Sequence, residues 1–182
     1  MVNIKSFKHI GEDVFLDPNI SIKRPELCSI GNHVAIDNCV ITVSVNIRDY
    51  VHISPFVSII GGKDGVFKCE GFNNIMAGAR IICASDRFDH SGLFGCMIPP
   101  KYKGTLITKP VIMEKFSNIG TNSIVLPGST LREGVLLAAG SLLIGDTEAW
   151  GVYKGNPAVL VKKINPEIIK KKYNELSSSY RV

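Results

Sequence analysis

The chain has 182 residues, of which 45% are apolar and 20% charged, so it can build a sizeable core and lacks the composition of a disordered protein. No uncharged run approaches the roughly eighteen residues of a membrane-spanning helix, and the N-terminus lacks the long apolar stretch of a secretory signal. We therefore expect a cytoplasmic protein without membrane insertion.

The net charge of +5 is concentrated near the C-terminus, where five lysines share one short stretch: Lys162, Lys163, Lys170, Lys171 and Lys172. Such a patch can attract nucleic acid, but the aromatic side chains that stack on bases are not interleaved with it. A phosphate-bearing small molecule is an equally good electrostatic match, and charge alone does not decide between the two.

The five cysteines are odd in number and never spaced as Cys-x2-Cys: Cys28, Cys39, Cys69, Cys83 and Cys96. This fits neither a disulfide framework nor a zinc site. We expect all five to be small apolar residues, buried in a protein of a reducing compartment.

The first half of the chain carries an imperfect six-residue repeat. Residues 10–14 look like an outermost unit, and residues 30–34 and 36–40 are two further units of the same form. Aliphatic residues continue this phase to residue 59, where a glycine-rich segment at 61–65 interrupts it before it resumes over 69–81.

Residues 84–110 form the longest interruption, and functional residues concentrate where a regular scaffold is interrupted. This segment contains Asp86, Asp89 and His90, followed by an apolar stretch and two prolines.

The repeat then runs without a slip through six aliphatic or methionine residues: Met113, Ile119, Val125, Leu131, Leu137 and Leu143. Four residues after each of the first five is a mostly small residue: Ser117, Ser123, Ser129, Val135 and Ser141. A period of six fits an α-helix poorly but suits two or three strand residues followed by a corner. We therefore predict a solenoid whose stacked coils bury a continuous apolar column.

A helix is predicted after the last coil. Asn165, Pro166 and Glu167 supply an N-cap, a proline in the first turn and an acid against the helix dipole. Ile169, Tyr173 and Leu176 then share one face, and we expect the helix to close the end of the solenoid. The expected organisation is a solenoid domain at 1–164, with its loop at 84–110, and a C-terminal helix and tail at 165–182.

The repeats resemble those of the hexapeptide-repeat acyltransferases. Residues 119–128, 138–141 and 155–158 resemble the galactoside, maltose and polysaccharide O-acetyltransferase branch, and the similarity covers roughly residues 28–163. The resemblance implies an all-β fold, a triangular left-handed parallel β-helix with an extruded loop and a short C-terminal α-helix. It also implies a homotrimer, with each active site between two subunits and the loop covering a neighbour's site.

The resemblance implies transfer of an acetyl group from acetyl-CoA to a sugar hydroxyl, in polysaccharide or lipopolysaccharide biosynthesis. The expected acceptor is a small sugar or nucleotide-sugar, with no nucleic acid and no metal. A hydroxyl needs a base to remove its proton, and the developing oxyanion needs hydrogen-bond donors.

His90 is the candidate base, because it lies in the loop beside Asp86 and Asp89, which could orient its imidazole or bind substrate hydroxyls. In the galactoside and maltose branch the catalytic histidine follows the strand almost directly, where this chain has Asp86. Either His90 has taken the role from four residues downstream, or Asp86 binds the sugar and the base lies elsewhere. His33 and His52 fall within regular units, where an outward-facing side chain is expected.

The donor site is expected from positions that match the family. Thr121 and Ala139 stand where backbone groups face the pantetheine arm of CoA. Ile144 and Gly145 replace a Thr-Lys pair, so a phosphate-contacting lysine is missing there. Lys162 falls on a basic position near the nucleotide, and Lys163 is adjacent.

Other functions are also compatible with the repeat. The main alternative is N-acetylation of a nucleotide-linked amino sugar, which could proceed without a protein base because a neutral amine is already nucleophilic. A carbonic anhydrase on this coil would need three histidines at one metal ion, and the four in this chain are too scattered. A purely structural solenoid would not explain the donor-site motifs.

Overall fold

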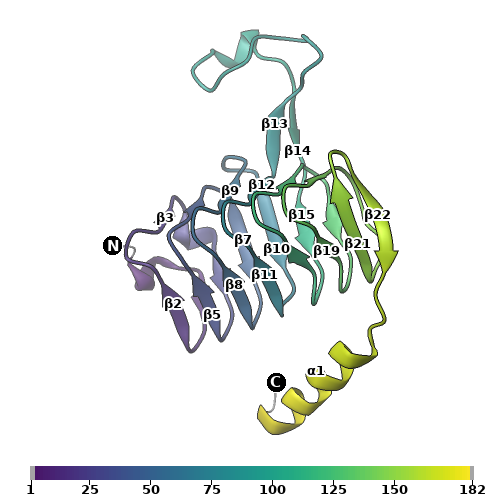
Figure 1. Cartoon of the computed structure of the whole chain (residues 1–182). Helices are drawn as coiled ribbons and strands as arrows, with labels where there is room; N and C mark the ends of the chain where they lie inside the picture. The colour runs from purple at the N-terminus through teal and green to yellow at the C-terminus, as the bar shows by residue number, and fades with distance from the viewer. Residues whose placement is uncertain (1–2, 181–182) are drawn as a thin grey trace.

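The computed structural model describes residues 3–180. The chain winds into a β-solenoid in which successive coils contribute short strands to three parallel sheets, here named A, B and C (Figure 1). Each parallel pair joins a strand to its counterpart in the next coil, so corresponding residues of successive coils lie above one another. No helix within residues 3–180 is both long and apolar enough to cross a membrane.

The strands are distributed as follows. Sheet A contains β1 (His9–Ile10), β4 (Ser29–Ile30), β7 (Ser44–Ile47), β10 (Val66–Cys69), β15 (Val111–Met113) and β18 (Thr130–Leu131). Sheet B contains β2 (Val14–Leu16), β5 (Val34–Ile36), β8 (Val51–Ile53), β11 (Asn73–Ile75), β16 (Asn118–Ile119), β19 (Leu136–Leu137), β21 (Gly151–Gly155) and β22 (Ala158–Lys163). Sheet C contains β3 (Ser21–Ile22), β6 (Val40–Ile41), β9 (Ser58–Ile60), β12 (Arg80–Ile82), β17 (Ile124–Val125) and β20 (Leu142–Leu143).

The interior of the solenoid is the apolar column that the repeat predicted. The six residues that recur from Met113 to Leu143 are all buried, with at most 2% of their surface exposed. The small residues four positions later are buried inside the corners, and the Ser123 hydroxyl donates to the carbonyl oxygen of Ala138 at 2.8 Å. The strand-and-corner prediction is therefore confirmed.

Four of the five cysteines belong to this interior. Burial raises the pKa of Cys39 and of Cys69 to about 12 and that of Cys83 to about 11, and it also raises the pKa of Cys28. The prediction is wrong for Cys96, which is exposed. Cys96 lies in the loop, where the repeat that predicts burial is absent.

The corner between sheets A and B, here corner AB, carries an aromatic column that the repeat did not indicate. Each coil places one residue there with a positive φ: Asp13, His33, Tyr50, Phe72, Phe116, Gly134 and Trp150. Ring centroids of Tyr50 and Phe72 lie 4.7 Å apart, close to the spacing of paired strands. Stacking of this kind contributes about 0.5–1.5 kcal/mol per pair and offsets the roughly 1–2 kcal/mol that a left-handed residue costs.

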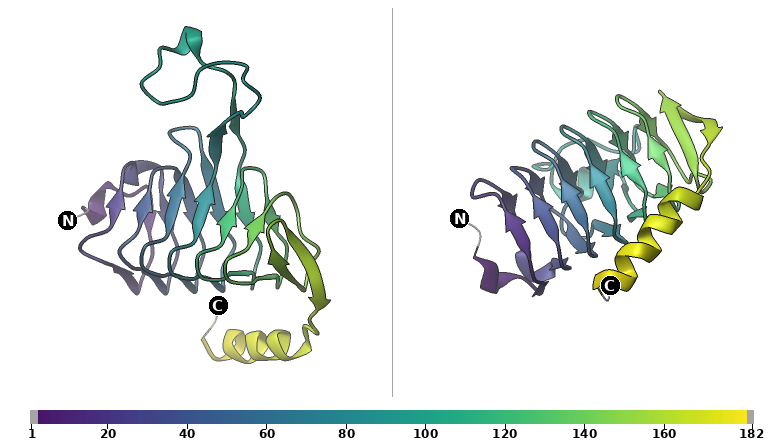
Figure 2. Two further views of the ribbon diagram at one scale, coloured as in Figure 1. Left: turned by 45° about the horizontal axis from the view of Figure 1, so that its top comes forward. Right: turned by 60° about the horizontal axis from the view of Figure 1, so that its bottom comes forward.

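Helix α1 (Glu167–Tyr180) begins as predicted, because the Asn165 side chain accepts a hydrogen bond from the Glu167 backbone N–H at 3.0 Å. It does not close the end of the solenoid, however. It runs back along the coils (Figure 2), where the Tyr173 ring packs edge-on against Phe72 and Phe116 at 5.2 and 5.4 Å. The aromatic column offers the apolar face of α1 a partner, and the end of sheet B is instead occupied by β22, paired antiparallel with β21.

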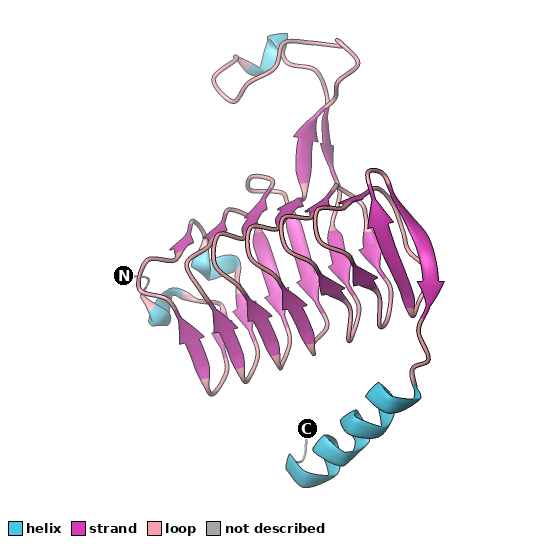
Figure 3. Ribbon diagram, viewed as in Figure 1, coloured by secondary structure: helices cyan, strands magenta, loops and turns pink. Residues whose placement is uncertain are grey.

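The segment 84–110 leaves the solenoid at the corner between sheets C and A, here corner CA. Strands β13 (Ala84–Asp86) and β14 (Leu106–Thr108) pair antiparallel and form the stem of a loop that projects away from the coils (Figure 3). The predicted interruption therefore has its own local structure.

Candidate active site

Asp89 is engaged by neighbours within the loop. Hydrogen bonds from Ser91 and the nearby Arg87 guanidinium lower the pKa of the Asp89 carboxyl. Its oxygens lie 2.7 Å from Arg87 Nε and 3.1 Å from the Ser91 backbone nitrogen, which donates to it. Asp89 is thus positioned to hold the loop turn rather than to orient an imidazole.

His90 is exposed, has a positive φ of 56°, and packs edge-on against Phe94 with 6.0 Å between ring centroids. Within residues 3–180 no carboxylate lies within ion-pair distance of its ring. Asp86 lies in the stem, where β13 pairs it with Leu106 of β14. The loop therefore brings Asp86, Asp89 and His90 into one segment but does not assemble a His–Asp pair.

Thr121 and Ala139 lie at the corner between sheets B and C, here corner BC, in adjacent coils. The Gly140 backbone N–H donates to the Thr121 carbonyl oxygen at 2.8 Å. A Cβ on Gly120 would meet the Ala139 backbone nitrogen at 2.5 Å, so the close stacking of these two corners requires glycine. Ala139 is exposed, which leaves its edge of the corner open to a ligand.

The other predicted donor residues are spread more widely. Ile144 and Gly145 lie at corner CA, where the Gly145 N–H donates to the Ser129 hydroxyl at 3.0 Å. Lys163 Nζ is 2.6 Å from a Glu148 carboxylate oxygen, so it already has an anionic partner. Lys162 is exposed in β22, opposite Val152 of β21.

Two histidines of the regular coils are paired with carboxylates, which the sequence reasoning missed. His52 Nε2 lies 2.9 Å from Asp37 Oδ2, and His33 Nδ1 lies 2.8 Å from Asp13 Oδ2. Both rings point outward as predicted. The first pair could have been found from the coil register, because His52 lies above Ala35 and Asp37 is two residues further along the same face.

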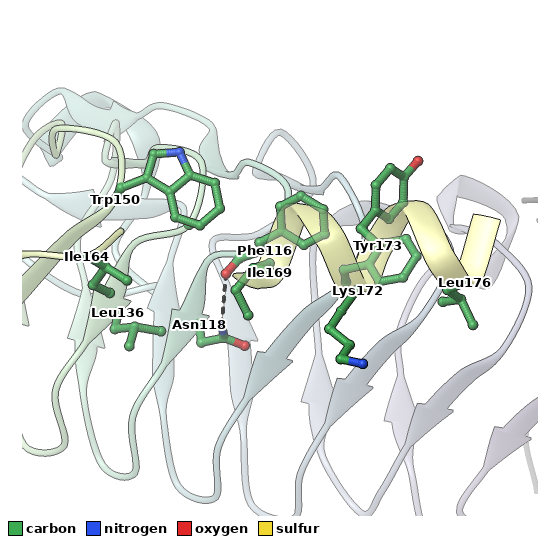
Figure 4. Close-up of a pocket in the computed structure, with 11 residues that line it drawn as sticks. Phe116, Asn118, Leu136, Trp150, Ile164, Ile169, Lys172, Tyr173 and Leu176 are labelled. Atoms are coloured by element: carbon green, nitrogen blue, oxygen red, sulfur yellow. Dashed lines mark hydrogen bonds between the residues drawn. The ribbon is translucent and has the colours of Figure 1, made fainter. Parts of the chain in front are cut away.

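Two grooves flank α1. The groove on the side of sheet B has a volume of about 390 Å³ and a largely apolar wall that includes Leu136, Trp150 and Ile169 (Figure 4). The groove on the side of sheet A is larger, about 560 Å³, and mixes the cations Arg48 and Lys68 with carboxylates.

The sequence comparison decides the family. No family model matches the chain. The chain is 31% identical to a dTDP-4-amino-4,6-dideoxy-D-glucose acyltransferase of Escherichia coli. The match spans 167 residues, which are 90% of this chain and 85% of that relative. The chain belongs to the hexapeptide-repeat acyltransferases. This chain is also 31% identical to the putative lipopolysaccharide biosynthesis O-acetyl transferase WbbJ of Escherichia coli K12, over 68% of this chain and 60% of WbbJ.

Solved structures agree with this assignment. The acyltransferase superposes on AntD, an N-acyltransferase from Bacillus cereus in complex with dTDP and 3-hydroxybutyryl-CoA, with a TM-score of 0.90 and 31% identity over 96% of this chain and 93% of AntD. The acetyltransferase VCA0836 of Vibrio cholerae shares the fold at 19% identity, with a TM-score of 0.60 over 88% of this chain and 76% of VCA0836. The predicted family, the parallel β-solenoid with one C-terminal helix, and the acyltransferase activity are confirmed.

Proposed function

We propose that this acyltransferase moves an acyl group from acyl-CoA, acetyl-CoA being the expected donor, to the amino group of a nucleotide-linked amino sugar. The observation that carries the proposal is the similarity to AntD over nearly the whole of both chains. Structures of AntD variants hold coenzyme A together with dTDP-4-amino-4,6-dideoxyglucose. The sequence alone favours a sugar hydroxyl as acceptor, with the amine as the alternative, so the proposal exchanges the two.

The donor would lie along corner BC. Thr121 and Ala139 offer backbone groups at an open edge, and the exposed Lys162 at the C-terminal end of sheet B supplies a cation for the phosphates. With Ile144 and Gly145 at another corner, and Lys163 held by Glu148, Lys162 is the residue of this set best placed to meet the nucleotide.

The acceptor chemistry also favours an amine. A hydroxyl must lose its proton as it attacks, and the loop histidine proposed for that task has no carboxylate partner among the described residues 3–180. A neutral amine attacks the thioester carbonyl carbon without prior activation, so it makes a smaller demand on the loop.

The loop supports a proposal about assembly. Phe88 and Met97 are 85% and 89% exposed, and Leu93, Phe94 and Tyr102 are also exposed, a concentration of apolar side chains that typically marks an interaction surface. We propose that the loop packs on a second copy in a homotrimer. Light scattering at micromolar concentration tests this, and a monomeric mass would contradict it.

We further propose that the protein acts in the cytoplasm, in assembly of a polysaccharide or lipopolysaccharide. The four buried thiols suit a reducing compartment, and acyl-CoA and nucleotide sugars are intracellular metabolites.

Acetylation of a sugar hydroxyl is the second candidate, favoured by the similarity to WbbJ. A thiol-release assay with acetyl-CoA separates the two candidates. Its acceptors would be dTDP-4-amino-4,6-dideoxyglucose, free sugars and polysaccharide fragments, with products identified by mass spectrometry. Release with the amino sugar alone supports N-acylation, release with hydroxyl acceptors alone supports the second candidate, and no release with any acceptor would overturn both.

A further inference from the structure

One row of outward-facing positions crosses sheet B from the first coil to the last. Its members stand in register from strand to strand: Phe15, Ala35, His52, Asn74, Asn118, Leu136, Val152 and Lys162. The row is polar in the middle, apolar on both sides, and cationic at its C-terminal end. A row with this order of polar, apolar and cationic side chains suits an extended ligand. The phosphate end of the ligand would meet the cation, and its other end would meet the polar residues.

His52 stands in the polar part of this row, and Asp37 fixes its ring. A carboxylate at neutral pH only accepts hydrogen bonds, so the 2.9 Å contact places the imidazole hydrogen on Nε2 and leaves the Nδ1 lone pair as an acceptor. The His52 side chain is 47% exposed and that of Asp37 27%. Asp37 therefore fixes the Nε2 edge of the His52 ring, and the half-exposed ring remains accessible to a ligand.

The other pair, His33–Asp13, provides an internal comparison. Its distance is similar, but Asp13 is 79% exposed, and the His33 ring stacks on Tyr50 at 4.7 Å at corner AB. The imidazole of His33 therefore belongs to the aromatic column, on the other side of sheet B from Thr121 and Ala139.

The position of His52 relative to the donor residues follows from the register. The corners that contain Asp37, Ser54, Met76 and Gly120 are stacked, each N–H donating to a carbonyl of the next coil. Thr121 follows β16, which lies two strands beyond β8, a step of roughly 10 Å at the usual strand spacing. An acyl-CoA with its phosphates near Lys162 and its arm passing Ala139 and then Thr121 directs its thioester toward the coil of His52.

We propose that His52, oriented by Asp37, is the group that accepts the proton of the attacking amine, an inference that rests on the proposed N-acyl transfer. The amine nitrogen forms a bond to the thioester carbonyl carbon, and the carbon–sulfur bond breaks. The nitrogen gives up one proton to His52 Nδ1, and the imidazolium passes a proton to the departing CoA sulfur. Amine and acyl-CoA thereby become amide and CoA thiol, and the histidine returns to its neutral form.

His52 lies on a strand of the solenoid, whereas the base predicted from the sequence, His90, lies in the extruded loop. The attacking nitrogen becomes positively charged as it bonds to the carbonyl carbon, so it must lose one proton before the amide is complete. A base fixed on a strand, rather than at the tip of a loop, keeps one geometry through both proton transfers.

The test measures kcat and KM against pH for the wild type, His52→Gln, Asp37→Asn and the control His33→Gln, with acetyl-CoA and dTDP-4-amino-4,6-dideoxyglucose. His52→Gln is expected to lower kcat by about 10²–10⁴-fold and to remove the acidic limb of the kcat–pH profile measured at saturating acceptor, with the KM for acetyl-CoA unchanged. Asp37→Asn is expected to lower kcat less and to alter the same limb. His33→Gln is expected to match the wild type.

Circular dichroism and CoA binding by calorimetry show which variants are folded. If the His52→Gln protein is not folded, the Asp37→Asn protein is used for the test instead. Turnover within threefold of the wild type, with an unchanged pH profile, in a folded His52→Gln or Asp37→Asn protein would overturn the inference and leave the proposed N-acyl transfer standing. A wild type that releases thiol only with hydroxyl acceptors would overturn both.

Discussion

The coils and the extruded loop of this acyltransferase differ in what determines the position of a side chain. In the coils, each residue lies above its counterpart in the neighbouring coil, so that His52 and Asp37 meet although 15 residues separate them. In the loop, Asp89 and His90 are adjacent in sequence, yet Asp89 bonds to Arg87 and Ser91. Coil register therefore organises polar groups within one chain, whereas the loop presents apolar side chains suited to a partner.

Thiol chemistry gives the sharpest contrast between the two regions. Cys39 and Cys69, with pKa values raised to about 12 by burial, should have only about 10⁻⁴ of their thiols in the reactive thiolate form at pH 8. We expect a thiol reagent to label Cys96 in the folded protein and all five cysteines after denaturation. Because a raised pKa withholds the thiolate until higher pH, labelling of the coil cysteines should increase as pH rises. Rapid labelling of more than one thiol at pH 8, measured by mass spectrometry, would contradict the contrast.

A matched pair of phenylalanines tests the packing of the two regions. Phe67 is fully buried in β10, whereas Phe88 in the loop is 85% exposed. Phe67→Ala should lower the free energy of unfolding by about 3–5 kcal/mol, because it leaves a cavity in the apolar column. Phe88→Ala should change it by less than about 0.5 kcal/mol in a monomeric protein. Urea unfolding monitored by circular dichroism measures both at a concentration where light scattering gives a monomeric mass, and equal losses there would show that the loop is packed within its own chain.

The proposed donor site at corner BC can be blocked without disturbing the core. Ala139→Trp adds a bulky side chain at an exposed position and should raise the KM for acetyl-CoA at least about tenfold, equivalent to about 1.4 kcal/mol. Glu12→Trp, at an exposed position of corner AB in the first coil, is the control and should leave this KM unchanged. Steady-state kinetics at saturating acceptor makes the measurement. An unchanged KM in Ala139→Trp would remove Ala139 from the donor site.

The same contrast separates what the sequence predicted from what it missed. The spacing of Met113, Ile119 and Val125 was enough to predict the strands, the corners and the buried column, because one period recurs in every coil. It could not indicate that α1 lies along corner AB, since that depends on an aromatic column formed by residues such as Phe72 and Phe116, which lie 44 positions apart. The sequence predicts a base in the loop, because an interruption of the repeat is visible in a sequence. The His52–Asp37 contact, in contrast, requires the exact length of one coil.

The attachment of α1 to the coils provides the smallest expected effect. The Tyr173 hydroxyl accepts a hydrogen bond from Lys115 Nζ at 2.7 Å, and the same ammonium lies 3.9 Å from the centroid of the Tyr173 ring. Tyr173→Phe keeps the ring and removes the acceptor, so the free energy of unfolding should fall by about 0.5–1.5 kcal/mol. The loop residue Tyr102, whose hydroxyl has no hydrogen-bond partner within residues 3–180, supplies the control Tyr102→Phe, expected to change the free energy by a few tenths of a kcal/mol at most. If the two substitutions have the same effect, the ring packing on Phe72 and Phe116, rather than the hydroxyl contact, holds α1 to corner AB.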